Sequence, residues 1–568
     1  MMKIKKINYK NFLPYICIMI ASFVALGAFF NAGYPSGHDL EYHAATVVGM
    51  SQHSIIDIFT GKVYGCISND LGYGEGFFYP PLAHTGAALI YKAISGFASV
   101  FTAFKIFYFL TTFLSGVFMY KFIMLISKHK KASTCAATLY ITTPYFLVDI
   151  LVRCAMAESL MFIFMPVILI ALYYLIHDRY KKFLVFFVIG CVGIVKSHLV
   201  LTMYFVMLCT LGFLPKIKLF FQKKRFLYLL LGAAITTLIS LPFLLPMLEA
   251  KNSIDYNVFQ PGFMVNFDII QNYRIPLDYL FSVDKVLIKI PLYLSLFGVV
   301  TLLYVFFNYK KIKLNNKNNS FLLYAIITTT ICLFCSTTLF SWEHIPDTLW
   351  LIQFPWRLLS FVSLGMGILV GISIPVMEKK CDWAIYALLI VSCLFSISQI
   401  NNHVQSSPKS QNTLPIDSAY VLDYVPVGIT LEEIKNHNHA IISDNKSVIV
   451  SNEKSNTPNL SFNVEGVNRT SEITLPRYYF IGYNIQTKKI GETDYRQVEY
   501  YNKDGYISFK IDSDSEVIVS YSGTKIQHIS YLVAGITALG CLVWVGVVLF
   551  KKNNPKSIAS QHQNKKMT

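Results

Sequence analysis

Residues 157–176 read AESLMFIFMPVILIALYYLI and carry a single charged side chain, Glu158, near their beginning. An α-helix of about 20 apolar residues is long enough to span the hydrocarbon core of a bilayer. The segment is therefore predicted to cross a membrane as a helix.

Similar apolar runs recur along most of the chain. The run 183–214 is too long for one crossing and is interrupted by Lys196-Ser197-His198, so we expect two short helices joined at that triplet. With this run counted twice, the sequence predicts about 12 transmembrane helices, in 12–31, 101–126, 133–150, 157–176, 183–214, 226–248, 286–307, 320–340, 350–375, 382–400 and 529–550. The expected fold class is a polytopic α-helical membrane protein.

The composition agrees with this interpretation. Of the 568 residues, 54% are hydrophobic and only 14% are charged, and the mean hydropathy is +0.48. The net charge of +17 does not indicate nucleic-acid binding, because most Lys and Arg residues stand in short runs between apolar stretches, where they orient helices in the membrane. The eleven cysteines are scattered, mostly inside apolar runs, which argues against a zinc site or a disulfide framework.

The basic runs also predict the topology, because such runs collect on the cytoplasmic side of a membrane. With twelve crossings and a cytoplasmic N-terminus, all seven runs fall on the inner side of the plasma membrane: Lys3–Lys10, Lys128–Lys131, Arg179–Lys182, Lys216–Arg225, Lys310–Lys317, Lys379-Lys380 and Lys551-Lys552. A crossing by the apolar segment 82–98 would break this agreement. We therefore expect that segment at the outer interface or in a re-entrant position.

These assignments divide the chain into three parts. Residues 1–400 are predicted to form a transmembrane domain of eleven spans, with an outer loop, 31–100, that carries interfacial helices. Residues 401–528 contain short alternating stretches separated by Asn, Asp, Gly and Ser, which predicts an extracytoplasmic β-rich domain. Residues 529–568 hold the last transmembrane helix and a cytoplasmic tail.

The outer loop begins with SGHDLEYH (36–43), directly after the first predicted span. If a helix starts near Asp39, the side chains of Asp39 and His43 share one face of it. A carboxylate beside low-dielectric lipid has a raised pKa and suits a general base. The alternative is that Asp39 caps a short interfacial helix.

The same loop continues with GYGEGFFYPPL (72–82). Its side chains Tyr73, Glu75 and Tyr79 would contact a sugar ring or an isoprenoid chain, whereas the alternative is a rigid turn. Lys62 and His84 would add polar contacts to this loop.

Four polar residues stand at the predicted outer ends of spans. Arg153 and Glu158 are five apart and would form either an ion pair or part of a site, and His198 lies at a helix–helix turn. Arg357 begins the tenth span, where a guanidinium faces a partner or a cavity, or else extends to the membrane surface. Because the predicted topology puts these residues on the same face as Asp39, we expect a site for an anionic lipid headgroup there.

Five stretches of the sequence resemble the GT-C superfamily of membrane glycosyltransferases, and more closely the bacterial membrane proteins labelled YfhO-like or 6-pyruvoyl-tetrahydropterin-synthase-related. They are GHDLEYH (37–43) with GYGEGFFYPPL (72–82), VRCAMAES (152–159), KSHL (196–199), IQFPWRLL (352–359), and DYVPV (423–427) with LPRYYFIGYNI (475–485). The resemblance covers most of the chain in the right order. It implies a GT-C-like transmembrane domain with an outer β domain.

The resemblance also implies roles for single residues. An acidic residue early in the first outer loop of GT-C enzymes is catalytic, and Asp39 matches that position better than Glu41. Basic residues near the outer face hold the donor phosphate, which here implies Arg357 first and Arg153 second.

The implied reaction transfers a sugar from a polyprenyl-phosphate-linked donor to an envelope acceptor, which is a glycan, a teichoic acid, a glycolipid or a protein. His43, His198 and Glu158 would support it. Some relatives use a divalent cation such as Mg²⁺ or Mn²⁺ and others do not, and Asp39 and His43 are the candidate ligands here.

Two other functions fit part of the pattern. A transporter or flippase of lipid-linked saccharides would share the basic residues, but would place charges midway along several spans. A non-catalytic envelope assembly protein would not need the carboxylate of Asp39.

Overall fold

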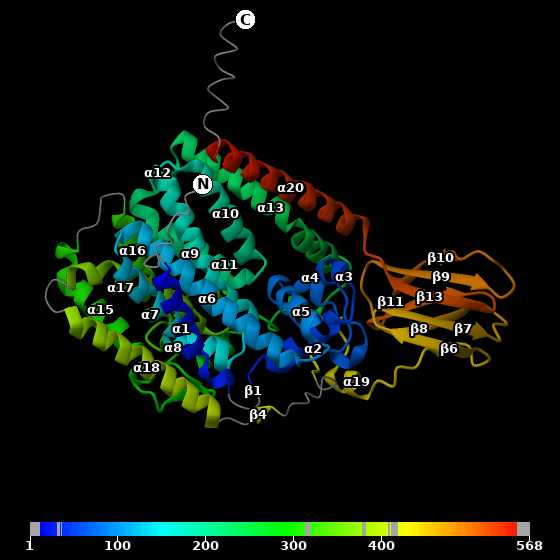
Figure 1. Cartoon of the computed structure of the whole chain (residues 1–568). Helices are drawn as coiled ribbons and strands as arrows, with labels where there is room; N and C mark the ends of the chain where they lie inside the picture. Colours follow the sequence, from blue (N-terminus) through cyan, green and yellow to red (C-terminus); the bar gives the residue numbers. More distant parts are fainter. Residues whose placement is uncertain are drawn as a thin grey trace, which may run out of the picture.

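The structure is a computed structural model that describes residues 12–30, 34–35, 37–312, 318–377, 382–406, 409–410 and 419–553. A helical part runs from α1 (Leu13–Ala25) to α18 (Asp382–Ser406), and a β-rich part projects from one side of it (Figure 1). The last helix, α20 (Lys525–Asn553), returns along the helical part. The expected basic runs at Lys3–Lys10 and Lys379-Lys380, residues 313–317 and the tail after residue 553 lie outside the described residues.

Eight of the described helices are long and apolar enough to cross a membrane, and a bent pair, Lys130–Thr142 with Pro144–Val152, makes a ninth if it counts as one span. The eight are α6 (Val100–Ser127), α9 (Met156–Ile176), α11 with α12 (Leu199–Phe220), α13 (Lys223–Lys251), α16 (Asn319–Ser336), α17 with the turn before it (Pro355–Met377), α18 and α20. The remaining predicted runs also form helices, but short ones: α1, α10 (Tyr180–Val195) and α15 (Leu296–Asn308). The polytopic membrane fold is confirmed, and the number of twelve crossings stays a prediction.

Several boundaries differ from the prediction. The run 286–307 begins as a hairpin of β2 (Val286–Leu287) and β3 (Ile290–Pro291), whose tip residues have positive φ, as a tight two-residue turn requires. The segment 82–98 forms α5 (Leu82–Ile94), which is too short to count among the spanning helices and packs against α2 and α6. Helix α18 continues to Ser406, beyond the expected domain boundary at residue 400.

Helices α9 and α17 form the centre of the helical part, where most of their side chains are buried. Small residues let α17 approach its neighbours closely, as is common for helices packed in lipid. A Cβ atom on Gly365 would lie 2.0 Å from Thr329 Oγ1 of α16, and one on Gly371 would lie 2.5 Å from Ile123 of α6. Helix α20 instead lies along α13 at the periphery and exposes most of its apolar side chains.

The outer loop forms four short helices, α2 (Leu40–Ser51), α3 (Ile55–Thr60), α4 (Glu75–Phe78) and α5, which lie between the helices and the β-rich part (Figure 1). Aromatic side chains of this loop enter the core of the β-rich part. Phe77 stacks on Phe480, and Phe78 contacts Tyr256 and Tyr424. The loop therefore joins the two parts of the molecule.

The β-rich part consists of two antiparallel sheets with the strand orders β10-β9-β13-β7-β6 and β11-β12-β8-β5. Alternate side chains of both sheets share one apolar core, for example Phe462 of β7, Val517 of β13 and Phe509 of β12. This confirms the β-rich region expected from the alternating stretches. The strands are β5 (Ile442–Ser443), β6 (Ile449–Asn456), β7 (Asn459–Glu465), β8 (Ser471–Tyr478), β9 (Tyr483–Lys489), β10 (Arg496–Val498), β11 (Tyr500–Lys503), β12 (Tyr506–Ile511) and β13 (Ser515–Tyr521).

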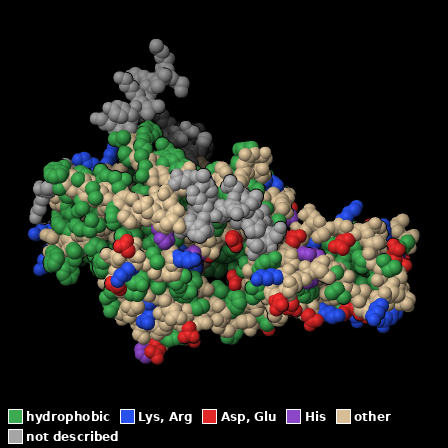
Figure 2. Space-filling view, turned by 90° about the horizontal axis from the view of Figure 1, so that it is seen from below, with side chains coloured by type: hydrophobic (Ala, Val, Ile, Leu, Met, Phe, Trp, Pro, Cys, Tyr) green, Lys and Arg blue, Asp and Glu red, His purple; other side chains and the backbone are tan. Residues whose placement is uncertain are grey.

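The two parts differ in surface chemistry. Figure 2 shows hydrophobic side chains over much of the helical end of the molecule, at the left, and frequent Lys, Arg, Asp and Glu side chains over the β-rich end, at the right. Apolar surface on this scale is stable against lipid and costly in water.

The expected topology can be tested by labelling single cysteines in a cysteine-free variant. Cysteine at Lys446, exposed in the β-rich part, should react with a membrane-impermeant maleimide added to intact cells, because we expect that part outside. Cysteine at Lys181, exposed at the start of α10, should react only after the membrane is permeabilised. Reaction of Lys181→Cys from outside, or protection of Lys446→Cys, would contradict the topology.

Candidate functional site

A break between α7 (Lys130–Thr142) and α9 brings charged side chains into the helical part. Thr143 has an extended backbone, because a residue before proline avoids the helical region. The chain then forms the short helix α8 (Pro144–Leu147) and a π-helical turn, Val148–Val152, before α9 begins. Such π turns are frequent at functional sites.

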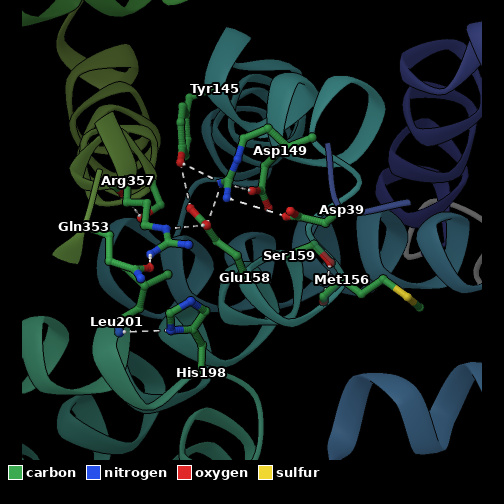
Figure 3. A network of polar contacts seen from close by, with 12 residues as sticks. Asp39, Tyr145, Asp149, Met156, Glu158, Ser159, His198, Leu201, Gln353 and Arg357 are labelled. Carbon is green, nitrogen blue, oxygen red and sulfur yellow. Dashed lines mark hydrogen bonds and ion pairs between the residues drawn. The ribbon is translucent and has the colours of Figure 1, made fainter. Parts of the chain in front are cut away.

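Arg153 follows this turn and is surrounded by carboxylates. Its Nη1 lies 2.9 Å from Asp149 Oδ1 and 2.6 Å from Glu158 Oε2, and all three side chains are buried. Tyr145 donates a hydrogen bond to Glu158 Oε1 at 2.7 Å (Figure 3). A charge buried in this way is stable only when it is paired. Arg153 is thus a cation held by two buried acids, and the ion pair with Glu158, one of the two alternatives from the sequence, is present.

Arg357 approaches Glu158 from the other side (Figure 3). Its Nε lies 3.4 Å from Glu158 Oε2, and its Nη1 donates hydrogen bonds to Gln353 Oε1 at 2.8 Å and to the carbonyl of Ile352 at 3.1 Å. The guanidinium also lies 4.8 Å from the ring centre of Phe354. With 12% of its side chain exposed, Arg357 is directed inward to Glu158 and does not extend to the membrane surface.

Asp39 lies at the accessible edge of this cluster. Its Oδ2 is 3.9 Å from Arg153 Nη2, and 42% of its side chain is exposed. Asp39 stands at the N-terminus of α2, but its carboxylate makes no capping hydrogen bond there. Its backbone N–H donates to the carbonyl of Arg153 at 3.1 Å. Gly37 makes this approach possible, since a Cβ atom on it would lie 2.4 Å from Cys154 Sγ.

His198 lies at the turn between α10 and α11, as expected. Its Nδ1 accepts a hydrogen bond from the backbone N–H of Leu201 at 3.3 Å and so caps α11. Burial lowers the pKa of His198 to about 3, and the positive charge of Arg357 acts in the same direction. His198 is therefore neutral at physiological pH.

A second buried cluster, formed by Tyr42, His43, Glu75 and His84, joins three helices of the outer loop. Glu75 Oε1 lies 2.7 Å from His84 Nδ1, and His84 Nε2 lies 2.7 Å from His43 Nδ1. Tyr42 donates a hydrogen bond to Glu75 Oε2 at 2.5 Å. Burial lowers the pKa of His43 well below its ordinary value, and His84 lowers it further, so His43 is neutral.

Tyr79 lies between the two clusters. Its ring stacks on His84 with 4.8 Å between the ring centres. Burial raises the pKa of Tyr79 well above its ordinary value, and the nearby charges of Glu75 and Asp39 act in the same direction. The two groups of charges therefore share one region of the outer loop.

Two of the predicted residues stand apart from these clusters. Glu41 is exposed, and within the described residues it has no ion pair or hydrogen bond. The Tyr73 hydroxyl accepts a hydrogen bond from the backbone N–H of Tyr424 at 3.3 Å, and its buried ring packs on that of Tyr424. Tyr73 therefore ties the loop to the segment that precedes the β-rich part.

Beside the second cluster lies a cavity of about 320 Å³, which we call the lysine cavity. It is lined by Lys62, Glu75, Tyr79, His84 and Lys196, and by apolar residues of α13 and α20. Because those two helices expose much of their apolar surface, we expect the cavity to lie at the boundary between the outer loop and the membrane.

Lys62 is buried without a carboxylate partner among the described residues. Its Nζ donates a hydrogen bond to the carbonyl of Pro242 at 2.9 Å. That carbonyl lacks its usual helical donor, because the residue four positions on is Pro246, which has no N–H. Burial lowers the pKa of Lys62 to about 7, and the charge of Lys196 lowers it further.

No group of three or more His, Cys, Asp or Glu side chains in the described part of the chain is arranged to hold a metal ion. His43, one of the expected ligands, directs its Nδ1 at His84, and Asp39 faces Arg153. Cys332 and Cys335 have the spacing of a metal-binding pair but lie inside the apolar helix α16. The role of Mg²⁺ or Mn²⁺ stays a prediction.

Sequence reasoning missed three polar residues of this region. Tyr145 and Asp149 lie inside the apolar run 133–150, where an acid four residues before Arg153 was a usable signal. Asp423 belongs to the stretch DYVPV (423–427), where the sequence alone does not indicate that its carboxylate lies near Glu75 and Asp39. Burial raises the pKa of Asp423 to about 6, and the negative charges of Glu75 and Asp39 raise it further.

Comparisons with known proteins give a few distant similarities. No protein-family model matches the chain. An uncharacterized protein of Lactococcus lactis subsp. cremoris (strain MG1363) is 24% identical over 327 residues, which are 54% of this chain and 51% of that protein, so the chain spans about half the length of this relative.

Two solved structures are similar to this one. ArnT from Cupriavidus metallidurans, bound to undecaprenyl phosphate, has 12% identity and a TM-score of 0.42 over 76% of this chain and 78% of its own. The oligosaccharyltransferase of Archaeoglobus fulgidus, in complex with Zn and sulfate, has 13% identity and a TM-score of 0.44 over 70% of this chain and 54% of its own.

Proposed function

We propose that this protein is a membrane glycosyltransferase of the GT-C type, which transfers a sugar from a polyprenyl-phosphate-linked donor to an envelope acceptor outside the cytoplasm. The observation that carries the proposal is the position of Asp39. Its carboxylate is accessible, does not cap its helix and lies beside the buried charge of Arg153. The resemblance of the sequence to GT-C enzymes points to the same residue.

In the proposed reaction, Asp39 accepts the proton of an acceptor hydroxyl. The acceptor oxygen forms a bond to the anomeric carbon of the donor sugar while the bond from that carbon to the phosphate oxygen breaks. The lipid phosphate leaves with the electron pair of that bond. The contact with Arg153, together with the hydrogen bond between the two backbones, supports this role because it fixes where the carboxylate points.

Two sets of cations are available to the donor phosphate. Arg357, the first choice from sequence, already shares Glu158 with Arg153, and the charge of Arg153 is taken up by carboxylates. Lys62 and Lys196 line a cavity next to lipid-facing helices and have no carboxylate partner among the described residues. We therefore assign the phosphate to the lysine cavity, and we assign to Arg357 a positioning role, because it shares Glu158 with Arg153, the residue that contacts Asp39.

The second cluster would support the cavity from one side. Glu75 and His84 line it, and the hydrogen bonds from Tyr42 to Glu75 and between His84 and His43 fix both side chains. An imidazole whose two nitrogens are both engaged holds one orientation. The donor sugar would then contact Tyr79, which also lines the cavity.

Asp39→Asn is expected to lower the rate of sugar transfer by about 10²–10⁴-fold, the usual contribution of a general base. The glycan composition of the envelope should change accordingly, at an unchanged level of the protein. Glu41→Gln is the matched control, because Glu41 lies two residues away and has no described partner. Normal glycan modification with Asp39→Asn would remove Asp39 from the mechanism.

Glu158→Gln is expected to destabilise the helical part by about 3–5 kcal/mol, because it leaves two buried guanidinium groups with one buried carboxylate, that of Asp149. The measurement is the midpoint of thermal unfolding of the detergent-solubilised protein. Glu343→Gln, at an exposed position, serves as the control. An unchanged midpoint for Glu158→Gln would show that the ion cluster does not hold these helices together.

The lysine cavity predicts a pH dependence of donor binding. Lys62 is protonated below its pKa of about 7 and loses its charge above it, so the apparent KM for the lipid donor should rise as pH is raised from 7 to 9. Lys62→Met should raise the KM at pH 7 and remove this dependence, whereas Lys251→Met, at the exposed end of α13, should leave both unchanged. A wild-type KM that is constant between pH 7 and 9 would exclude Lys62 from phosphate binding.

A further inference from the structure

A second cavity, of about 410 Å³, lies where the outer loop meets the β-rich part. It is formed by the 3₁₀ turn Ser68–Asp70, by the segment before β5 and by strands β6 and β8. Its polar lining consists of Asn69, Asp70, His439, Glu453, Ser455 and Arg477. We call it the β cavity. Its size is that of a small-molecule pocket.

Arg477 is the unusual member of this lining, because it is only 1% exposed and has no carboxylate within ion-pair distance among the described residues. Its hydrogen bonds go to neutral groups: Ser455 Oγ at 2.6 Å, the carbonyl of Pro476 at 2.7 Å and the carbonyl of Asn459 at 3.4 Å. Its Nε has no hydrogen-bond partner within the described part of the chain. A buried guanidinium with an unused donor is costly unless a ligand completes it.

The loop side of the β cavity is held rigidly. Asp70 accepts hydrogen bonds from the backbone N–H of Cys66 at 3.1 Å and from the Thr457 hydroxyl at 3.0 Å. Asn69 donates to the carbonyls of Ile434 and His437 at 2.7 and 3.1 Å. The shape of the β cavity therefore does not depend on a ligand to bring its walls together.

The charges of the β cavity indicate which kind of ligand fits. Arg477 contributes one positive charge, and Asp70 and Glu453 contribute one negative charge each. The excess of acidic charge disfavours a simple anion, and the buried guanidinium disfavours a cation. The lining offers both donors and acceptors, and Glu453 is exposed with no described partner. A neutral ligand with several hydroxyl groups, each able to donate and to accept, uses all of these groups.

We propose that the β cavity is a saccharide-binding subsite that holds a neutral sugar residue of the acceptor. The proposal rests on the proposed glycosyltransferase function and names the chemistry by which the β-rich part recognises its substrate. Arg477 and Ser455 donate to hydroxyl oxygens of the sugar, and Glu453 accepts from a hydroxyl.

Binding can be measured without any transfer reaction. The full-length protein in nanodiscs would be mixed in turn with three neutral ligands, the methyl glycosides of glucose, galactose and N-acetylglucosamine. Two anionic ligands, the methyl glycoside of glucuronic acid and inorganic phosphate, would be tested in the same way. Affinities would be obtained by saturation-transfer NMR for the glycosides and by ³¹P line broadening for phosphate. At least one neutral glycoside should bind. Glu453→Gln should weaken its binding by about tenfold, as expected for the loss of one charge-assisted hydrogen bond.

Two controls keep this test specific. Glu465→Gln changes an exposed acid on the neighbouring strand β7 and should bind as the wild type does. Asp39→Asn should also bind normally, so a failure of the catalytic proposal and a failure of this one are distinguishable. The proposal would be overturned if no neutral glycoside binds, or if only the glycoside of glucuronic acid or phosphate binds. It would also be overturned if Glu453→Gln and Glu465→Gln bind the neutral glycoside equally well.

Discussion

The helical part depends on the ion pairs that the carboxylate of Glu158 forms with two arginines. One buried acid lies within 3.4 Å of two guanidinium groups, that of Arg153 after the π turn and that of Arg357 before α17. Without it, Arg153 would keep the carboxylate of Asp149 as a buried partner, and Arg357 would have no carboxylate partner among the described residues, which is costly in a low-dielectric interior. By fixing Arg153, Glu158 also fixes the place of Asp39, because the start of α2 is bound to Arg153 through both its backbone and its side chain. The geometry around Asp39 thus follows from one buried ion cluster.

The outer loop lines two cavities on different sides of this rigid centre. On one side, α3, α4 and α5 meet α13 and α20 around the lysine cavity, where a lipid phosphate would enter from the membrane. On the other side, the turn at Asp70 meets the β-rich part around the β cavity, where a sugar would enter from water. A donor that is a lipid and an acceptor that is a glycan require two such approaches. The aromatic contacts of Phe77 and Phe78 with the β-rich part hold the two regions in a fixed relation.

The features that the sequence predicted well are local ones. The length of apolar runs predicted the helices, and the short alternating stretches within 401–528 predicted a β-rich domain, because both depend on neighbouring residues. Arg153, Glu158 and Arg357 were also found, since a charge at the end of an apolar run is rare. Contacts across long separations were not predictable. Lys62 meets Pro242, which is 180 residues away, and the raised pKa of Asp423 reflects charges on the outer loop. Nothing in the local pattern distinguishes these residues from surface ones.

Sugar transfer by the purified protein is the most direct test of the proposed function. The protein would be reconstituted in vesicles with radiolabelled polyprenyl-phosphate-linked sugars and an envelope glycan extract, and the label would be followed from the lipid fraction to the glycan fraction. The label is expected to move to the glycan, and Asp39→Asn is expected to stop this movement. Label that stays on the lipid but changes leaflet would instead indicate a flippase, and would contradict the glycosyltransferase function.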